Sequence, residues 1–193
     1  MISEDISIPL CVDLDGTLIK EDTTQIAALK YGGYNPLKWL QIGVWFLYKR
    51  HAYMKQKLAQ HVTLTPDDWT IIPKMLDVIK EEKSAGRKVF LVSATDIKFA
   101  RAAANDPLCQ GYFSDETIIA SEGTINLRSA EKAKCLVENF GEGQFIYAGN
   151  STHDLPVWAK GTSPIIVVEK KPSKLANQLV KSQKNVTIIF QEK

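Results

Sequence analysis

The sequence has few cysteines, little net charge and no long hydrophobic run, and each shortage argues against a class of protein. Cys11, Cys109 and Cys135 are too few and too widely spaced for a disulfide framework or a zinc site, so we expect a reducing, cytoplasmic compartment. The formal charge of +2 at pH 7 is too small to predict nucleic-acid binding. The N-terminal segment lacks the basic and apolar regions of a signal peptide, and we expect none.

The longest apolar stretch is WLQIGVWFLY at residues 39–48, which is about half as long as a bilayer-spanning helix. A buried helix is one interpretation of this stretch. Lys38, Lys49 and Arg50 flank it, which leaves a second interpretation open, a surface that rests on a membrane or on a hydrophobic partner. The stretch therefore predicts either core or a peripheral contact, but no membrane span.

Short apolar segments alternate with helical patterns along the chain. Strands are expected at residues 8–14, 88–93, 116–121, 144–149, 163–169 and 186–190. Helices are expected at 24–31, 36–62, 65–86, 96–105 and 130–140, in a segment that ends at 158, and within 170–184. Within 36–62, residues 53–62 are expected to form a separate helical segment. This alternation predicts an α/β protein with a Rossmann-like, three-layer parallel sheet. We expect a core domain of residues 1–19 and 71–193, with a small helical cap at residues 20–70 inserted after the first strand.

Two carboxylates follow the first strand directly. In CVDLDGT, Asp13 and Asp15 lie one residue apart and precede Gly16 and Thr17. Like charges this close raise each other's pKa unless a cation or a proton lies between them, so we expect a positive group here. Caps and Asx-turns are the alternative for paired aspartates at a turn. A calcium loop is excluded, because the residues its pattern requires at positions 17, 18 and 24 are absent.

Four segments in order resemble the motifs of the haloacid dehalogenase-like superfamily of aspartate-nucleophile phosphatases. They are CVDLDGT, the strand VFLVS, a lysine at the start of a helix (Lys132), and GNSTHD. More narrowly, CVDLDGTLIKEDT and FIYAGNSTHDLPVW resemble the domain fused to some UbiA-type membrane prenyltransferases. The resemblance extends over residues 8–168.

The resemblance implies a Mg²⁺-dependent phosphatase that hydrolyses a phosphomonoester through an aspartyl-phosphate intermediate. The resemblance assigns Asp13 as the nucleophile and Asp15 as the acid and base. It implies that phosphate is bound by Ser93, Ala94 and Lys132, and that Mg²⁺ is bound by the Asp13 side chain, the Asp15 carbonyl and Asn150. The supporting residues that it implies are Asp154, Gly16 and Thr17. Asn150 stands where many relatives have aspartate, so one ligand is neutral and the affinity for the metal is expected to be lower.

The motif lysine has two candidates. Ser129 is predicted to be a helix cap, and a cation three residues later opposes the helix dipole. An unfavourable cation at this position predicts an anion beside Lys132. Lys134 is the rival for the same role. Asp154 is expected to orient either the waters of the metal or Lys132, with helix capping as its alternative role.

The substrate is expected to be macromolecular or lipid-linked, because a small cap leaves the sheet edge open. Five aromatic residues of the cap favour an aromatic-lined entrance for phosphotyrosine: Trp39, Trp45, Phe46, Tyr48 and Tyr53. The resemblance instead favours a prenyl-linked or sugar phosphate at a membrane. Two further hypotheses are a dehalogenase and a low-turnover binding module that docks to a membrane or a protein. The sequence does not predict an oligomeric state.

Overall fold

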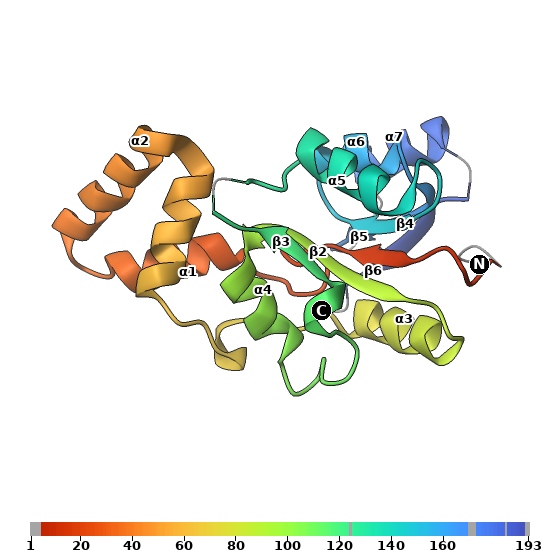
Figure 1. The fold of residues 1–193 in the computed structure, drawn as a ribbon, viewed down its shortest axis with the longest axis horizontal. Coiled ribbons are helices and arrows are strands. Elements are labelled where there is room, and N and C mark those ends of the chain that lie inside the picture. The colour runs from red at the N-terminus through yellow and green to blue at the C-terminus, as the bar shows by residue number, and fades with distance from the viewer. Residues whose placement is uncertain (1–4, 124, 170–172, 184, 192–193) are drawn as a thin grey trace.

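A single parallel sheet forms the centre of the protein (Figure 1). The computed structural model describes residues 5–123, 125–169, 173–183 and 185–191. Its six strands are paired in the order β3-β2-β1-β4-β5-β6, and every pair is parallel. They are β1 Leu10–Val12, β2 Val89–Asp96, β3 Ile118–Ser121, β4 Ile146–Gly149, β5 Thr162–Val168 and β6 Thr187–Phe190. The predicted parallel α/β architecture is confirmed.

Helices cover both faces of the sheet and make three layers. α3 (Pro73–Ser84) and α4 (Ile97–Ala104) lie on one face, while α5 (Ala130–Phe140), α6 (Leu155–Trp158) and α7 (Lys174–Ser182) lie on the other (Figure 1). Successive side chains of a strand point to opposite faces, so Leu10 and Val12 join the first core cluster and Cys11 joins the second. Burial on both faces explains why β1 has no polar alternation in the sequence.

The strand order reverses at β1, which pairs with β2 on one side and β4 on the other. In open parallel sheets the carboxyl ends at such a switch point form a crevice for ligands. The backbone of Asp13 continues the ladder, because its N–H donates to the Ala148 carbonyl at 2.9 Å. The motif after β1 therefore lies directly beside the motif after β4.

Two helices, α1 (Thr23–Gly32) and α2 (Pro36–His61), follow β1 and lie beyond the edge of the sheet where these motifs meet (Figure 1). The predicted helix N-cap at Asn35 is confirmed, since its side chain accepts from Leu37 N–H and Pro36 occupies the first turn of α2. The separate helical segment expected at 53–62 is wrong. Residues 44–61 contain neither glycine nor proline, and α2 continues through them as one helix. The division into a core and a cap domain stays a prediction.

β2 extends further than the sequence predicted, to Asp96 instead of Ser93. Its pairing with β3 shifts register between these two residues, so the strand passes through an irregularity rather than ending. Asp96 then caps α4 by accepting from Lys98 N–H at 3.0 Å. Three short 3₁₀ helices complete the described elements: Pro66–Asp68, Asp115–Thr117 and Thr152–Asp154. Within the described residues, no helix has both the length and the apolar character needed to cross a bilayer.

Candidate active site

A cavity of about 620 Å³ opens where the carboxyl ends of β1 and β4 meet the α1–α2 insertion. Most of its lining residues are charged or polar. They come from five parts of the chain: the loop after β1 with the start of α1, the second half of α2, Ala94 of β2, the residues from Arg128 to Lys132, and the loop after β4. Of the residues predicted for the site, Asp13, Asp15, Gly16, Ala94, Lys132, Asn150 and Asp154 line this cavity.

Asp13 is buried at the end of β1. Its Oδ1 accepts a hydrogen bond from Leu14 N–H and another from the Lys132 ammonium, both at 2.9 Å. Among the described residues, every hydrogen bond to this carboxylate ends on Oδ1. Burial raises the pKa of Asp13 above its usual range and the Asp154 carboxylate adds to this, although the Lys132 ammonium opposes the shift. Oδ2 is thus the oxygen that remains for a ligand in the cavity.

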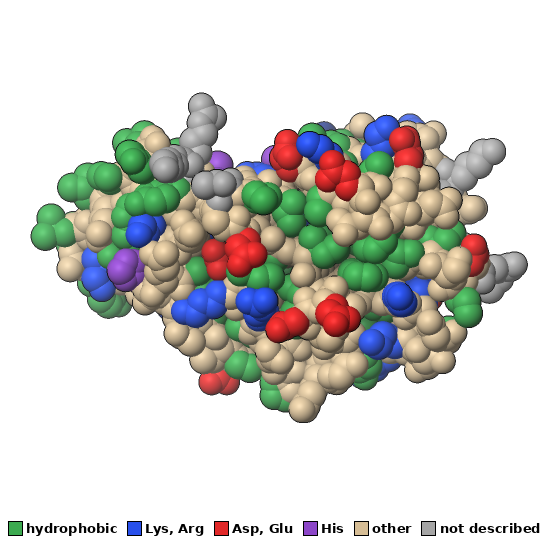
Figure 2. Space-filling view, viewed as in Figure 1, with side chains coloured by type: hydrophobic (Ala, Val, Ile, Leu, Met, Phe, Trp, Pro, Cys, Tyr) green, Lys and Arg blue, Asp and Glu red, His purple; other side chains and the backbone are tan. Residues whose placement is uncertain are grey.

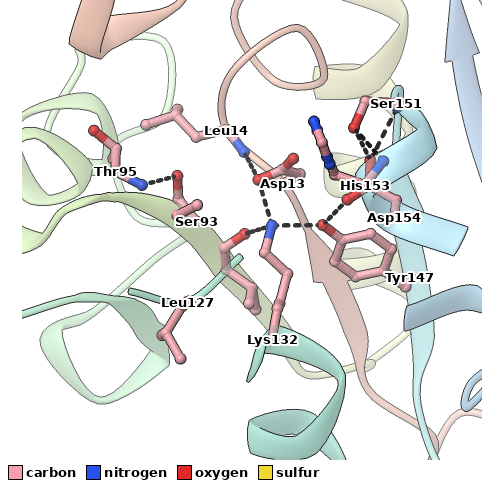
Figure 3. Close-up of polar contacts among 12 residues, drawn as sticks. Asp13, Leu14, Ser93, Thr95, Leu127, Lys132, Tyr147, Ser151, His153 and Asp154 are labelled. Atoms are coloured by element: carbon pink, nitrogen blue, oxygen red, sulfur yellow. Dashed lines mark hydrogen bonds and ion pairs between the residues drawn. The ribbon is translucent and has the colours of Figure 1, made fainter. Parts of the chain in front are cut away.

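Lys132 lies at the centre of a buried polar chain that joins the two motifs (Figure 3). Besides Asp13, its Nζ donates to the Tyr147 hydroxyl at 2.7 Å and to the Val92 carbonyl at 3.3 Å. The Tyr147 hydroxyl donates in turn to Asp154 Oδ1 at 2.9 Å. Lys134, the rival candidate, is exposed and lies 3.9 Å from Glu138 on the outer face of α5. The geometry favours Lys132 because a buried ammonium requires an anion and neutral acceptors around it.

The structure also alters two expectations for these neighbours. Ser129 occupies the N-cap position of α5 at a positive φ of 55°, but its side chain makes no capping hydrogen bond. Asp154 was expected to orient either the waters of the metal or Lys132, and it is linked to Lys132 through the hydroxyl of Tyr147. The Oδ2 atom of Asp154 accepts from the backbone N–H groups of Asn150 and Ser151, so the carboxylate shapes the loop after β4.

Asp15 lines the same cavity. Its Oδ1 accepts from the N–H of Thr23, the first residue of α1, at 2.9 Å. Burial raises its pKa to about 7, the nearby Asp22 carboxylate contributes to the rise, and the Thr23 hydrogen bond opposes it. A carboxyl group with this pKa exchanges its proton readily near neutral pH.

Gly16 and Asn150 are in close contact. Gly16 has a φ of +72°, and a side chain there would place its Cβ 1.9 Å from Asn150 Nδ2. Glycine is therefore required both for the left-handed backbone and for the approach of the amide. Thr17 is fully buried behind this turn, and its hydroxyl has no hydrogen-bond partner within the described part of the chain.

Ser93 is placed differently from its predicted neighbour Ala94. Ser93 is fully buried, and its Oγ accepts from Thr95 N–H at 3.0 Å, whereas Ala94 lines the cavity. The Ala94 carbonyl accepts from Lys55 Nζ at 2.6 Å and from the Ser121 hydroxyl at 2.8 Å. The phosphate-binding role of Ser93 stays a prediction, with its hydroxyl proton as the available donor.

Three residues of the site were missed by the sequence analysis: Tyr147, Lys55 and Thr23. Tyr147 lies inside an apolar strand, where the sequence pattern predicts a core side chain and not a site residue. Lys55 comes from α2, forty residues from the first motif, and its burial lowers its pKa. Thr23 holds Asp15 through its N–H, and its hydroxyl lies 2.6 Å from that of Thr95. No local pattern distinguishes these residues, although the helix start at Thr23 could have indicated an anion acceptor.

The donor set fits a magnesium ion. No group of three or more His, Cys, Asp and Glu side chains is clustered within the described residues, which argues against a cage made of protein ligands alone. Mg²⁺ prefers oxygen ligands and is usually held by one or two carboxylates, with waters and a substrate phosphate completing its shell. Asp13, Asp15 and Asn150 line one cavity and offer such oxygens.

Comparison with solved structures decides the fold. The chain superposes on a haloacid dehalogenase (HAD) family hydrolase, t0658, from Salmonella enterica serovar Typhi, with a TM-score of 0.60 and 15% identity over 93% of this chain and 69% of that one. The chain has the HAD fold. A phosphoserine phosphatase in its apo form superposes with a TM-score of 0.57 and is 18% identical, over 94% of this chain and 93% of that one. A phosphoserine phosphohydrolase-like protein from Francisella tularensis superposes with a TM-score of 0.57 and is 16% identical, over 93% of this chain and 94% of that one.

Sequence comparison adds one relative. An uncharacterized protein, y4nM, from Sinorhizobium fredii is 35% identical over 164 residues. The match includes 84% of this chain, but the chain spans only 30% of the length of that relative. No family model matches the sequence. The HAD fold is thus shown by structure, and the narrower resemblance to the domain fused to UbiA-type prenyltransferases stays a prediction.

Proposed function

We propose that this chain is a Mg²⁺-dependent phosphatase that hydrolyses a phosphomonoester through an aspartyl-phosphate intermediate. The observation that carries the proposal is the buried Asp13–Lys132 pair at the switch point of the HAD fold, with Asp13 Oδ2 left for a substrate. Lys132 restrains the carboxylate and adds positive charge where phosphate oxygens would lie. The bound Mg²⁺, held by Asp13, the Asp15 carbonyl and Asn150, would neutralise charge on the phosphate.

The proposed chemistry has two displacements. Asp13 Oδ2 forms a bond to phosphorus as the bond to the ester oxygen breaks, and Asp15 gives its proton to the departing alkoxide. Asp15 then removes a proton from a water that attacks the phosphorus, which releases inorganic phosphate and restores the Asp13 carboxylate. The raised pKa of Asp15, about 7, supports this double role, because both protonation states are populated near neutral pH.

The walls of the cavity bear on the substrate. The aromatic-lined entrance expected for phosphotyrosine is wrong, because none of the five cap aromatics is among the residues that line the cavity. Trp45 is buried against Tyr31, with ring centroids 5.1 Å apart, and the other four lie elsewhere on α2. Phosphotyrosine and prenyl-linked or sugar phosphates therefore stand as equal substrate hypotheses. Catalytic efficiencies on phosphotyrosine peptides, phosphoserine peptides and prenyl or sugar phosphates at matched Mg²⁺ would distinguish them.

The experiment that tests the reaction uses Asp13→Asn, a nearly isosteric change that removes the nucleophile. We expect the wild-type chain to hydrolyse p-nitrophenyl phosphate with Mg²⁺ and to lose that activity in chelator, while Asp13→Asn remains folded and inactive. Lys134→Met, which removes an exposed charge on the outer face of α5, is the control for a charge change outside the site. Normal turnover by a folded Asp13→Asn protein would overturn the mechanism.

A dehalogenase and a binding module predict different results. A dehalogenase would release halide from a haloacid and would not turn over the phosphate ester. A binding module would hold phosphate or a phosphorylated ligand without turnover, in both the wild-type chain and the Asp15→Asn variant. The raised pKa of Asp15 favours the phosphatase over both, because neither of them uses a second acid beside the nucleophile.

A further inference from the structure

The first half of α2 carries a stripe of exposed apolar side chains. Leu37, Leu40, Val44, Leu47 and Tyr48 follow the spacing of one helical face, and each is between 54% and 81% exposed. We call these five residues the α2 stripe. An exposed apolar face of this extent is unusual on a protein surface and marks a site of interaction.

The stripe is distinct from the face that packs inward. Ile42 and Trp45 are buried, and Trp45 lies against both Tyr31 of α1 and His61 at the end of α2. The packing between α1 and α2 therefore uses the opposite face of α2 and does not involve the stripe. Figure 2 shows hydrophobic side chains gathered over the α1–α2 end of the molecule, away from the sheet. This places the stripe where a large, flat partner could reach it.

The charge of the segment indicates the kind of partner. Residues 23–66 contain no aspartate or glutamate, and they contain six cationic residues: Lys30, Lys38, Lys49, Arg50, Lys55 and Lys57. Basic and acidic residues are intermixed in residues 67–169, whereas residues 170–191 form a second segment with five lysines and no acidic residue. Of these two cationic segments, residues 23–66 carry the α2 stripe. Exposed leucines with aromatic rings and a surplus of lysine and arginine are typical of helices that lie in the interface of an anionic bilayer.

We propose that the α2 stripe docks this chain onto an anionic lipid surface. The apolar side chains would enter the boundary between headgroups and acyl chains, and the exposed Lys38 beside the stripe would lie among the lipid phosphates. Lys55 and Lys30 are engaged within the protein, by the Ala94 carbonyl and by Asp68. A second copy of the chain fits less well, because two cationic segments would repel each other across the contact.

Docking would also bring the cavity close to the headgroups. His51, Met54 and Lys55, in the second half of α2, line the cavity, and about 10 Å of helix separates Tyr48 from Lys55. Docking itself does not depend on catalysis. Loss of lipid binding would leave hydrolysis of a water-soluble ester intact, and Asp13→Asn would leave lipid binding intact, so the two proposals fail separately.

The test is co-sedimentation of the full chain with phosphatidylcholine vesicles, with and without phosphatidylglycerol. We expect binding to the anionic vesicles, weakening at high salt, and a loss of about tenfold or more in Leu40→Gln/Leu47→Gln. The matched control is Leu108→Gln/Val180→Gln, which replaces comparably exposed apolar residues elsewhere and should bind within about twofold of wild type.

A measurement on the wild-type chain avoids any effect of these variants on folding. Trp39 is 41% exposed, whereas Trp45, Trp69 and Trp158 are buried, so brominated phosphatidylglycerol vesicles should quench Trp39 fluorescence, and Trp39→Phe should remove the quenching. Absence of binding and quenching would overturn the proposal. So would equal binding by the Leu40→Gln/Leu47→Gln variant, equal binding to neutral vesicles, or self-association abolished by that variant without any lipid binding.

Discussion

Lys132 shows how a residue that is unfavourable locally becomes central to a site. As a cation in the first turn of α5 it opposes the helix dipole. Asp13, Tyr147 and the Val92 carbonyl surround its ammonium and offset that cost together with the cost of burial. Part of the positive charge expected beside Asp13 is therefore supplied by the protein itself.

Replacing Lys132 with methionine should remove this charge and leave the Asp13 carboxylate without its partner. We expect Lys132→Met to lower catalytic efficiency by about 100-fold or more and to destabilise the chain at neutral pH by about 3 kcal/mol. Lys134→Met, which alters an exposed ion pair, should change each quantity little. Steady-state kinetics and urea denaturation would measure both. The same loss in the two variants would contradict the assignment of Lys132.

Asp15 should make the metal-free protein less stable as the pH rises. Its pKa of about 7 in the folded state lies above the value of about 4 in an unfolded chain, so folding favours the protonated form. This stabilisation is fully present below about pH 4 and is lost as the pH rises through 7. Asp15→Asn removes the titration, and Asn can still accept from Thr23 N–H.

In chelator at pH 8 we therefore expect Asp15→Asn to melt higher than the wild-type chain, by about 2–4 °C for each kcal/mol gained. Below about pH 4 the difference should be small, because the carboxyl is then protonated in both the folded and the unfolded chain, and it should grow as the pH rises from about 4 to 7. Thermal denaturation of both proteins across this range measures the effect. A difference that does not depend on pH would show that Asp15 has an ordinary pKa.

At the scale of elements, the turn after β1 brings the two motifs together. β1 ends at Val12, and Asp15 is positioned by the Gly16 turn and by the start of α1. Gly16 also makes room for the Asn150 amide from the loop after β4. The spacing of the first motif therefore reflects the contact between two loops.

Gly16→Ala should displace Asn150 and strain the turn. We expect a higher Mg²⁺ requirement, by about tenfold, and a loss of stability of about 1 kcal/mol or more. Gly143→Ala is a close control, because Gly143 has nearly the same φ of +73° but a Cβ added there would have nothing within 4 Å. The control should lose similar backbone stability and keep its Mg²⁺ requirement. Equal Mg²⁺ requirements in the two variants would contradict a role for the Gly16–Asn150 contact.

At the scale of the whole molecule, the proposed metal site would draw its ligands from distant parts of the chain. Asp13 and Asp15 follow β1 and Asn150 follows β4, and Asp154 and Asp22 place further negative charge around them. A cation that binds only the folded chain stabilises it by mass action. Metal binding should therefore be visible as thermal stabilisation without any substrate.

We expect Mg²⁺ to raise the melting temperature in a concentration-dependent way. Asn150→Ala should shift the concentration needed upward by about tenfold or more, since one ligand is lost. Ser151→Ala, in the same loop, changes a side chain that bonds to Asp154 and is not a proposed ligand, so it serves as the control. Differential scanning fluorimetry measures all three proteins. An unchanged midpoint in Asn150→Ala would show that Asn150 is not a ligand.

Much of the fold and of the candidate site could be predicted from the sequence because it depends on local patterns. The bounds of α5, the cap at Asn35 and the presence of six strands follow from apolar runs and turn residues. Asp13 and Asp15 were identified by their spacing after the first strand, and Lys132 and Asn150 by the resemblance to the motifs of the superfamily. That Asp13, Asp15 and Asn150 line one cavity follows from the rule that carboxyl ends of parallel strands share an edge, whereas Lys132 reaches the cavity from the first turn of α5.

Only the tertiary structure decided which partners these residues have. Lys132 and Asp13 are 119 residues apart in the sequence, and the choice of Lys132 over Lys134 depends on which side of α5 faces the sheet. Tyr147 and Lys55 entered the site because packing placed them there, and the aromatic residues of α2 lie outside the cavity for the same reason. Local sequence determines which backbone elements form, whereas burial and hydrogen bonding between distant elements determine the environment, and hence the chemistry, of each side chain.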